Sequence, residues 1–203
     1  MKDIVIATRS DHKAAEIRRI LAHLPCRLRT LRDIDFPETD EESTIENAAT
    51  FVGNARAKAR WFFERCKLPV IADDSGLEVF ALGGLPGVRT RRFAIDAGYT
   101  GLEGIELDHA NNRLLLERLE GVPDDRRGAR YVCAAAFCAE RDLVAIGTCD
   151  GVIAREPVGS GGFGYDPLFL LPDLQLTFAQ VSPDVKHSRS HRARAFRALA
   201  TLL

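Results

Sequence analysis

Apolar runs alternate with segments of helical periodicity along the first part of the chain. Residues 4–7 are apolar throughout, which is typical of a buried strand. Over residues 12–24 the apolar positions recur every three or four residues, which predicts a helix. A second helix is expected over residues 46–66, and a short buried strand over residues 69–72. This alternation indicates a sheet covered by helices.

The pattern changes in the second part of the chain, where two strand-like segments follow each other. A helix is expected over residues 101–119, closed by Gly121. Residues 131–139 and 143–154 then predict two long strands that can pair as neighbours. The last expected element is a helix over residues 190–202. Together the two halves favour an α/β or α+β fold with a mixed sheet.

Length and composition suit a globular protein. With 203 residues, 46% hydrophobic and 28% charged, we expect residues 1–203 to form a single domain. No apolar stretch approaches the roughly 20 residues of a membrane helix, and the first apolar run is too short for a signal peptide. The five cysteines form no C-x-x-C pair, which argues against a disulfide framework or a zinc site. A cytoplasmic protein without a membrane partner is expected.

The charges nearly cancel but are unevenly distributed. Lys plus Arg number 28 and Asp plus Glu 29, and this net charge of -1 disfavours a general nucleic-acid coat protein. Residues 33–46 contain seven acids and no Lys or Arg, whereas residues 185–197 contain five bases, two histidines and no acid. A single fold can bring two such segments to opposite sides of one site. The acids from Asp33 to Glu42 are most simply a solvated loop.

A first candidate for chemistry lies at the junction between the first strand and the first helix. It reads Thr8-Arg9-Ser10-Asp11-His12-Lys13. The free N–H groups and positive dipole of a helix N-terminus suit a phosphate, and the hydroxyls of Thr8 and Ser10 and the charge of Lys13 would add to them. The alternative is an ordinary helix cap made by Ser10 or Asp11, with Lys13 solvated.

Two adjacent carboxylates, Asp73 and Asp74, follow a predicted buried strand, where an α/β sheet often presents its site. Adjacent strand residues face opposite sides, so only one of the two should point fully into a pocket unless the strand has ended. Carboxylates in such a place often hold Mg²⁺ together with water and substrate phosphate. The alternative is an Asp-Ser-Gly turn that ends the strand.

The Gly-rich segment 159–167 formally matches G-x-G-x-x-G. No helix follows it, because residues 168–171 resemble a strand, and a dinucleotide site is therefore disfavoured. Phe163 or Tyr165 could stack on a flat ring, and Asp166 could accept a hydrogen bond from a ring N–H. The alternative is a structural loop whose aromatic side chains belong to the core.

The basic segment Lys186-His187-Ser188-Arg189-Ser190-His191-Arg192 leads into the last helix, with Ser190 as a plausible N-cap. Its Lys and Arg side chains could bind phosphate or base oxygens, although such a run is often a solvated face. A P-loop is excluded because G-x-x-x-x-G-K-[ST] does not occur. The four segments jointly supply a phosphate clamp, a metal carboxylate, an aromatic loop and a basic closing segment, as a nucleotide hydrolase requires.

Three motifs resemble the inosine triphosphate pyrophosphatase family, the XTP/dITP diphosphatases that act on deaminated purine nucleotides. The matches are residues 72–77 followed by 83–88, then residues 161–169, then Lys186 with residues 190–192. Their order and spacing fit essentially the whole chain. The resemblance implies an α/β (α+β) fold: an elongated mixed β-sheet flanked by helices in two lobes, with a central cleft. It also implies a homodimer.

The resemblance further implies a role for individual residues. Those that would bind substrate are Thr8, Arg9, Ser10, Asp11, His12 and Lys13 for the triphosphate, Lys58 for phosphate, Ser75, the purine-holding Phe163, Gly164, Tyr165 and Asp166, and the base-recognising Lys186, His191 and Arg192. Asp74 would be the catalytic general base, and Glu46 and Asp74 would hold Mg²⁺. The first motif departs from the family's Thr-Gly-Asn-x-x-Lys, because Arg9 replaces Gly and Ser10 replaces Asn.

The expected reaction is attack of water on the α-phosphorus of ITP, dITP or XTP, giving a monophosphate and pyrophosphate. A donor such as Arg192 would favour the 6-oxo group of these purines over the amino group of ATP. One alternative is a related pyrophosphatase for modified pyrimidine nucleotides. Another is a nucleotide-binding module without turnover. Nucleic-acid binding through residues 185–197 is a third alternative, which the net charge disfavours.

Overall fold

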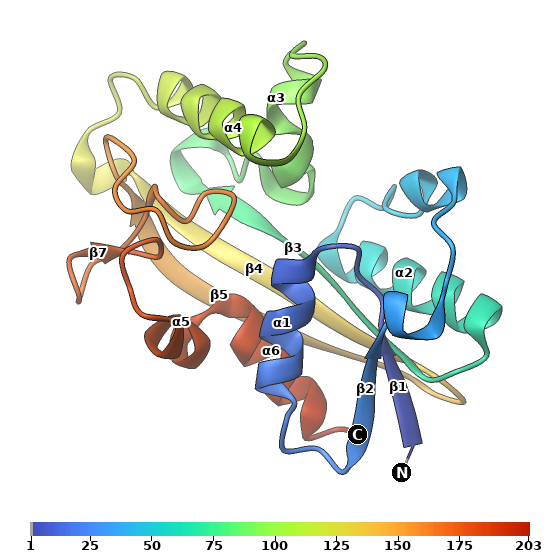
Figure 1. Ribbon diagram of the computed structural model, residues 1–203. Helices are drawn as coiled ribbons and strands as arrows, with labels where there is room; N and C mark the ends of the chain where they lie inside the picture. Colours follow the sequence, from blue (N-terminus) through green and yellow to red (C-terminus); the bar gives the residue numbers. More distant parts are fainter. Residues whose placement is uncertain (1) are drawn as a thin grey trace. The chain divides into compact units, whose positions relative to one another are not determined.

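The strands of the protein form one mixed sheet. The computed structural model describes residues 2–203, and its seven strands are hydrogen-bonded in the order β2-β1-β3-β4-β5-β6-β7 (Figure 1). They are β1 (Lys2–Ile6), β2 (Cys26–Thr30), β3 (Val70–Val79), β4 (Gly128–Cys138), β5 (Asp142–Ile153), β6 (Phe169–Leu171) and β7 (Leu176–Thr177). β1 pairs in parallel with β2 and β3, whereas β6 pairs antiparallel with β5 and β7. The predicted mixed sheet, with β4 beside β5, is confirmed.

Six α-helices accompany the sheet within residues 2–203. They are α1 (Asp11–Ile20), α2 (Phe51–Cys66), α3 (Phe93–Asp96), α4 (Gly104–Arg118), α5 (Pro183–Arg189) and α6 (His191–Ala200). The four predicted helices are confirmed as α1, α2, α4 and α6, with shifted ends. α2 begins only at Phe51, because Thr50 is extended and its side chain accepts a hydrogen bond from Gly53 N. Ser190 caps α6 as predicted, since its Oγ accepts from Ala193 N at 3.2 Å.

One expected strand has the wrong end, and another strand was not predicted. The strand predicted over residues 69–72 continues to Val79, so Asp73 to Gly76 lie within β3 and form no turn. The strand persists because Leu77 and Val79, beyond the polar stretch, are fully buried. β2 was missed because its sequence, CRLRT, alternates arginine with only two apolar side chains. Such a polar strand is tolerated at the edge of a sheet, where β2 lies.

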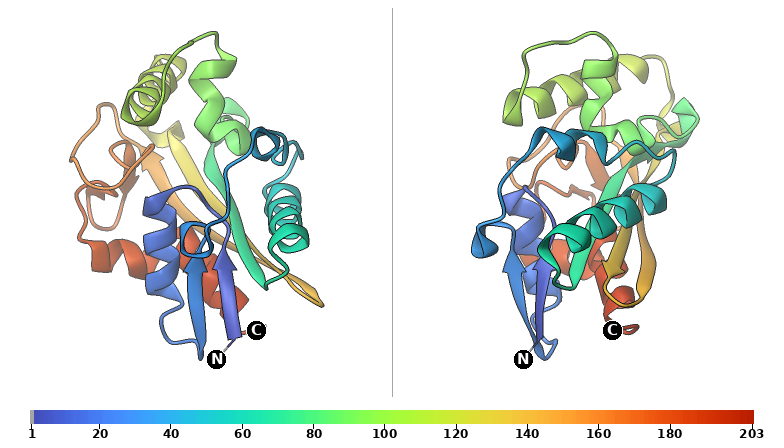
Figure 2. Two further views of the ribbon diagram at one scale, coloured as in Figure 1. Left: turned by 45° about the vertical axis from the view of Figure 1, so that its right-hand side comes forward. Right: turned by 90° about the vertical axis from the view of Figure 1, so that its right-hand side faces the viewer.

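The chain forms two compact units. Unit 1 comprises the described residues up to Ser75, Val132–Thr148 and Arg189–Leu203, and therefore holds both ends of the described chain (Figure 2). Its core gathers apolar residues of β1, α1, β3, β4 and α6, among them Ile6, Ile17, Ile71, Phe137 and Phe196. α1 and α6 lie side by side in this unit (Figures 1 and 2).

A glycine allows α6 to approach the sheet of unit 1. Gly147 in β5 lies so close to the α6 backbone that a Cβ there would collide with His191 O and Ala195 N. Any side chain at this position would push away the helix that begins with His191 and Arg192. The close packing of α6 on β5 therefore sets where these two predicted site residues lie.

Unit 2 comprises Gly76–Tyr131 and Cys149–Ser188. Three rings form the centre of its core: Phe169 lies 4.6 Å from Tyr131 and 5.0 Å from Phe178 between ring centroids. α3 packs beside α4 in a smaller apolar cluster. All five cysteines carry free thiols, and no helix within residues 2–203 has the length and hydrophobicity that a membrane crossing requires.

Candidate active site

The loop between β1 and α1 combines the two interpretations that the sequence left open. Ser10 caps α1, since its Oγ accepts a hydrogen bond from Lys13 N at 3.3 Å, and Thr8 Oγ1 accepts from Ser10 N at 3.2 Å. Asp11 and His12 are exposed on the first turn of the helix. The capping alternative expected Lys13 to be solvated. Instead its Nζ forms an ion pair with Asp73, at 3.4 Å from Oδ2.

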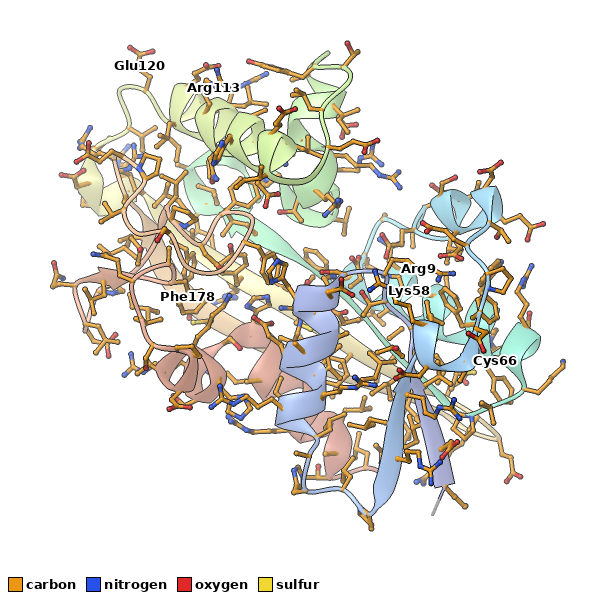
Figure 3. All side chains as sticks on the ribbon, viewed as in Figure 1. Arg9, Lys58, Cys66, Arg113, Glu120 and Phe178 are labelled. Atoms are coloured by element: carbon orange, nitrogen blue, oxygen red, sulfur yellow. The ribbon has the colours of Figure 1, made fainter. Side chains whose placement is uncertain are left out.

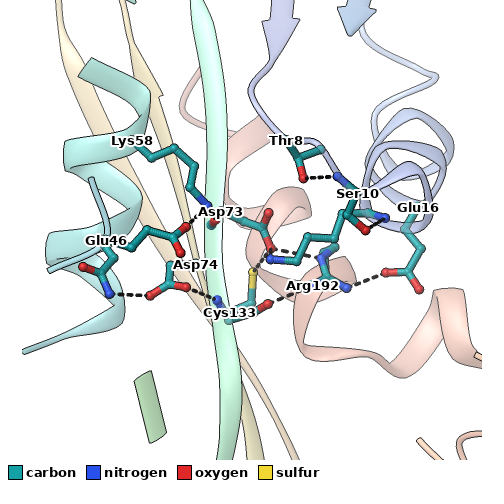
Figure 4. A network of polar contacts seen from close by, with 12 residues as sticks. Thr8, Ser10, Glu16, Glu46, Lys58, Asp73, Asp74, Cys133 and Arg192 are labelled. Carbon is teal, nitrogen blue, oxygen red and sulfur yellow. Dashed lines mark hydrogen bonds and ion pairs between the residues drawn. The ribbon is translucent and has the colours of Figure 1, made fainter. Parts of the chain in front are cut away.

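Asp73 and Asp74 extend to opposite sides of β3, as the alternation of a strand requires (Figure 4). On one side, Asp73 Oδ2 accepts a hydrogen bond from Arg192 Nε at 3.1 Å. On the other, Asp74 Oδ2 accepts from Asn54 Nδ2 at 2.9 Å. The two carboxylates therefore have different partners and can have different functions.

Asp73 is an ionised anchor for cations. It is 1% exposed, and burial alone would raise the pKa of its carboxyl. Lys13, Arg192 and Lys58 outweigh this effect and hold the pKa of Asp73 well below its ordinary value. A carboxylate that stays charged throughout the physiological range is a poor general base. We therefore assign Asp73 to the support of the surrounding cations.

Arg192 is held by three side chains of unit 1. Its Nε bonds to Asp73, its Nη1 to Glu16 Oε2 at 2.5 Å, and its Nη2 to Ser75 Oγ at 2.8 Å (Figure 4). The residue is 2% exposed, and His191 before it is also buried. Glu16, one helical turn after Lys13, was missed in the sequence because a lone carboxylate in a surface helix carries no motif.

Asp74 has the electrostatic surroundings of a general base. It is 6% exposed, and burial, followed by the nearby charge of Glu46, raises the pKa of Asp74 to about 6. Lys58 forms an ion pair with Glu46 and donates a hydrogen bond to Asp73 O at 2.9 Å. Burial raises the pKa of Glu46, but Lys58 outweighs burial and the net shift is downward. Glu46 is thus ionised beside a carboxyl that titrates near neutrality.

Asn54 orients Asp74 and was not singled out in the sequence. Its Nδ2 donates to Asp74, while its Oδ1 accepts from Ala48 N at 2.8 Å. It precedes Lys58 by four residues, so both side chains lie on one face of α2. That spacing was the signal that could have revealed it.

The pair Glu46 and Asp74 fits a hard divalent cation. Mg²⁺ prefers one or two carboxylates, with water and substrate phosphate completing its shell. The negative charge of Glu46 contributes, after burial, to the raised pKa of Asp74. A bound cation would reduce the repulsion between these two carboxylates. Within residues 2–203 no group of three or more His, Cys, Asp or Glu side chains is arranged to hold a metal. A cation here would therefore rely on these two carboxylates.

In unit 2 the Gly-rich loop folds around Asp166. The Asp166 Oδ2 atom accepts hydrogen bonds from Lys186 Nζ at 2.6 Å and from Phe163 N at 2.9 Å. Lys186 Nζ also lies 4.8 Å from the centroid of the Phe163 ring. The Asp166 carboxylate occupies the space that a Cβ at Gly162 would need, and Gly162 has a φ of +74°. The loop and Lys186 of α5 thus place a ring, a carboxylate and an ammonium within a few ångströms of one another.

Helix α4 holds this loop in place through two residues that the sequence did not single out. Asp108 Oδ2 accepts from Gly164 N at 2.8 Å, and Asn112 Nδ2 donates to Gly164 O at 2.9 Å. Tyr165 is 4% exposed and donates to Thr90 O at 2.9 Å. Its ring belongs to the core, as the structural alternative predicted. Phe163, the other aromatic residue of the loop, is half-buried.

Comparison with known proteins identifies the family. The sequence model of the Ham1 family matches residues 4–202, and the chain belongs to this family. It is 44% identical over 202 residues to a dITP/XTP pyrophosphatase of Frankia alni, covering 98% of this chain and 96% of the relative. It is 43% identical to a dITP/XTP pyrophosphatase of Geobacillus kaustophilus, covering 98% and 93%. The structure of a HAM1 protein from Coxiella burnetii superposes with a TM-score of 0.84 at 35% identity, covering 100% of this chain and 98% of that one.

Proposed function

We propose that this protein hydrolyses ITP, dITP and XTP to the nucleoside monophosphate and pyrophosphate, as a hydrolase of acid anhydrides that removes deaminated purines from the nucleotide pool. The relatives named dITP/XTP pyrophosphatases support this substrate class. The observation that carries the proposal is Asp74, a buried carboxyl with a pKa of about 6 that Asn54 holds beside Glu46.

Asp74 acts as the general base. A base is most effective when its pKa lies near the working pH, because enough of it is ionised while it still takes up a proton readily. Asp74 accepts the proton of a water molecule as that water attacks the α-phosphorus. The bond from the α-phosphorus to the bridging oxygen breaks, and pyrophosphate leaves. The bond from Asn54 keeps the carboxyl from rotating away from the water.

The cations of unit 1 neutralise the triphosphate. Lys13, Lys58 and the N-terminus of α1 offer positive charge and N–H donors to phosphate oxygens, the main requirement of phosphoryl chemistry. Glu46 and Asp74 are the residues that would hold Mg²⁺. When bound, Mg²⁺ offsets phosphate charge and lowers the pKa of water.

The loop of unit 2 suits a 6-oxopurine. Phe163 offers a ring for stacking, and Asp166 offers an acceptor for a ring N–H. An ammonium group carries three N–H donors, which allows Lys186 to hold Asp166 and also donate to a 6-oxo oxygen. The amino group of ATP would place a donor against this donor and be rejected.

We propose further that the protein is a homodimer, as the resemblance to its family implies, and that it works in the cytoplasm without binding nucleic acid, as its cysteine usage and its net charge of -1 suggest. Light scattering coupled to gel filtration tests the dimer. A mass corresponding to one chain would overturn it.

Pyrophosphate release from a substrate panel tests the function. The panel contains ITP, XTP, ATP, GTP, UTP and dTTP, each with Mg²⁺ and with EDTA. We expect rapid Mg²⁺-dependent release from ITP and XTP and little from ATP. Preference for the pyrimidine nucleotides would favour the related pyrophosphatase, and ITP binding without release would favour a binding module.

A further inference from the structure

Arg9 connects the loop before α1 to the acidic segment that follows β2. Its Nε and Nη2 donate to the two oxygens of the Glu42 carboxylate at 3.0 and 2.6 Å. Its Nη1 donates to Phe36 O at 3.1 Å, and Nη2 also donates to Pro37 O at 2.8 Å. Arg9 is labelled in Figure 3. We call residues 36–46 the strap.

The Arg9–Glu42 pair differs from the surface ion pairs of the chain. It is bidentate, and the side chains are only 28% and 14% exposed. The guanidinium also lies 5.9 Å from the centroid of the Phe36 ring. Bidentate, partly buried pairs are held more firmly than exposed ones, because water competes less for the charges. The expectation of a solvated loop through Glu42 was therefore wrong at this residue.

The strap is also fastened along its other side, to α2. Phe36 packs against Phe62 with ring centroids 5.3 Å apart, and against Trp61 at 6.2 Å. Glu41 forms an ion pair with Arg65 at 2.9 Å. The guanidinium of Arg65 lies 3.7 Å from the centroid of the Trp61 ring. Arg9 thus links the strap to the loop between β1 and α1. The contacts of the strap with α2 do not involve Arg9.

The position of the strap matters because of where it ends. Its last residue, Glu46, pairs with Lys58, whose Nζ also donates to the backbone oxygen of Asp73, the neighbour of Asp74 in β3 (Figure 4). Two residues further on, Ala48 N donates to the Asn54 side chain that orients Asp74. A displacement of the strap would therefore move both Glu46 and the group that holds the catalytic carboxyl.

We propose that Arg9 is a positioning residue that holds the strap so that Glu46 stays beside Asp74. Its guanidinium serves Glu42 and two carbonyl oxygens rather than the triphosphate. The effect on metal use rests on the proposed function, whereas the effect on the strap does not.

Three variants test this: Arg9→Gln, Glu42→Gln and the double variant. Arg89→Gln is a matched control, because Arg89 also forms a bidentate pair, with Asp96, and both residues belong to unit 2 whereas the strap belongs to unit 1. The first readout is hydrogen–deuterium exchange of the strap amides without nucleotide or metal. The second is ITP hydrolysis against Mg²⁺ concentration, with KM and kcat measured at saturating Mg²⁺.

We expect faster exchange over residues 38–46 in both single variants and no greater exchange in the double variant. The half-saturating Mg²⁺ concentration should rise about tenfold in each, at the lower end of the effect of losing a group that orients a metal ligand. The KM for ITP at saturating Mg²⁺ should change little. Arg9→Lys should keep part of the wild-type protection and Mg²⁺ affinity, because one ammonium can pair with Glu42 but cannot bond to all the acceptors of Arg9.

A higher KM for ITP in Arg9→Gln alone, with exchange and Mg²⁺ dependence unchanged, would overturn the proposal and make Arg9 a phosphate contact. Unchanged behaviour of both single variants would overturn it as well, as would additive effects in the double variant. Exchange is measured without substrate, so it tests the strap even if the wild-type protein fails to hydrolyse ITP. That failure would count against the proposed function alone.

Discussion

Asn54 Nδ2 lies 2.9 Å from Asp74 Oδ2, and this hydrogen bond joins α2 to the carboxyl on β3 that we assign as the base. A donor to a carboxylate favours its ionised form. In wild type it lowers the pKa of Asp74 against the larger effect of burial, which leaves that pKa at about 6.

Asn54→Leu should therefore move the acid limb of the pH profile of kcat/KM upward, because the pKa of Asp74 rises further when the bond is lost. The kcat value should also fall about tenfold or more, since the carboxyl is no longer oriented. Steady-state rates across the pH range check both effects. An acid limb that stays in place would show that Asn54 does not bond to the base.

Asp74→Asn should stabilise the protein at neutral pH. A folded pKa raised above the ordinary 3.8 means that the folded state resists ionisation, so the wild type loses stability as pH rises through about 6. The variant has no such loss. We expect it to be about 2–3 kcal/mol more stable than wild type near pH 8, and about equal near pH 4. Urea unfolding in EDTA at both pH values measures this, and equal stability at the higher pH would contradict the assigned environment.

Asp73→Ala, in contrast to Asp74→Asn, should lower the stability of the protein at neutral pH. The pKa of Asp73 is held well below its ordinary value, so its ionised form contributes stability above the ordinary pKa, and that contribution is lost as the pH falls. Removing it leaves Arg192 buried with one carboxylate fewer, at a cost of about 3–5 kcal/mol. Urea unfolding near neutral pH measures the loss, and Asp142→Asn, at an exposed ion pair, serves as the control. A change below 1 kcal/mol, the range of surface pairs, would contradict the role of Asp73.

Asn112→Leu should loosen the loop that holds the purine. Gly164 O then loses its donor from α4, so KM for ITP should rise about tenfold, with a smaller change in kcat. The exposed neighbour Arg113, labelled in Figure 3, gives the control variant Arg113→Gln. A fall in kcat at unchanged KM would instead place Asn112 in the support of the chemical step.

The sequence predicted the framework because periodicity follows directly from burial. The helices α1, α2, α4 and α6 and the pair β4–β5 carry clear apolar patterns. β2 does not, since an edge strand needs few apolar residues. The end of β3 was misplaced because Asp73-Asp74-Ser75-Gly76 has the composition of a turn. The strand continues because Leu77 packs in a core with residues far along the chain, such as Leu115 and Phe169.

The motifs indicated the residues that we assign to the chemistry but not the residues that hold them. Lys58 and Asp74 stand in recognisable segments, so their chemistry was accessible from the sequence. Arg9 was expected at the triphosphate, yet its guanidinium donates hydrogen bonds to Glu42 and to two carbonyl groups far along the chain. Such pairings depend on loop geometry, which leaves no periodic trace in a single sequence.

The central claim is that Asp74 is the base of a Mg²⁺-dependent pyrophosphate release from the deaminated purine nucleotides ITP, dITP and XTP. The most direct measurement compares wild type with Asp74→Asn, using ITP with saturating Mg²⁺ and following pyrophosphate. We predict release by wild type and a loss of kcat of about a thousandfold in the variant, with the fold intact. Turnover of the variant within a few fold of wild type would contradict the account.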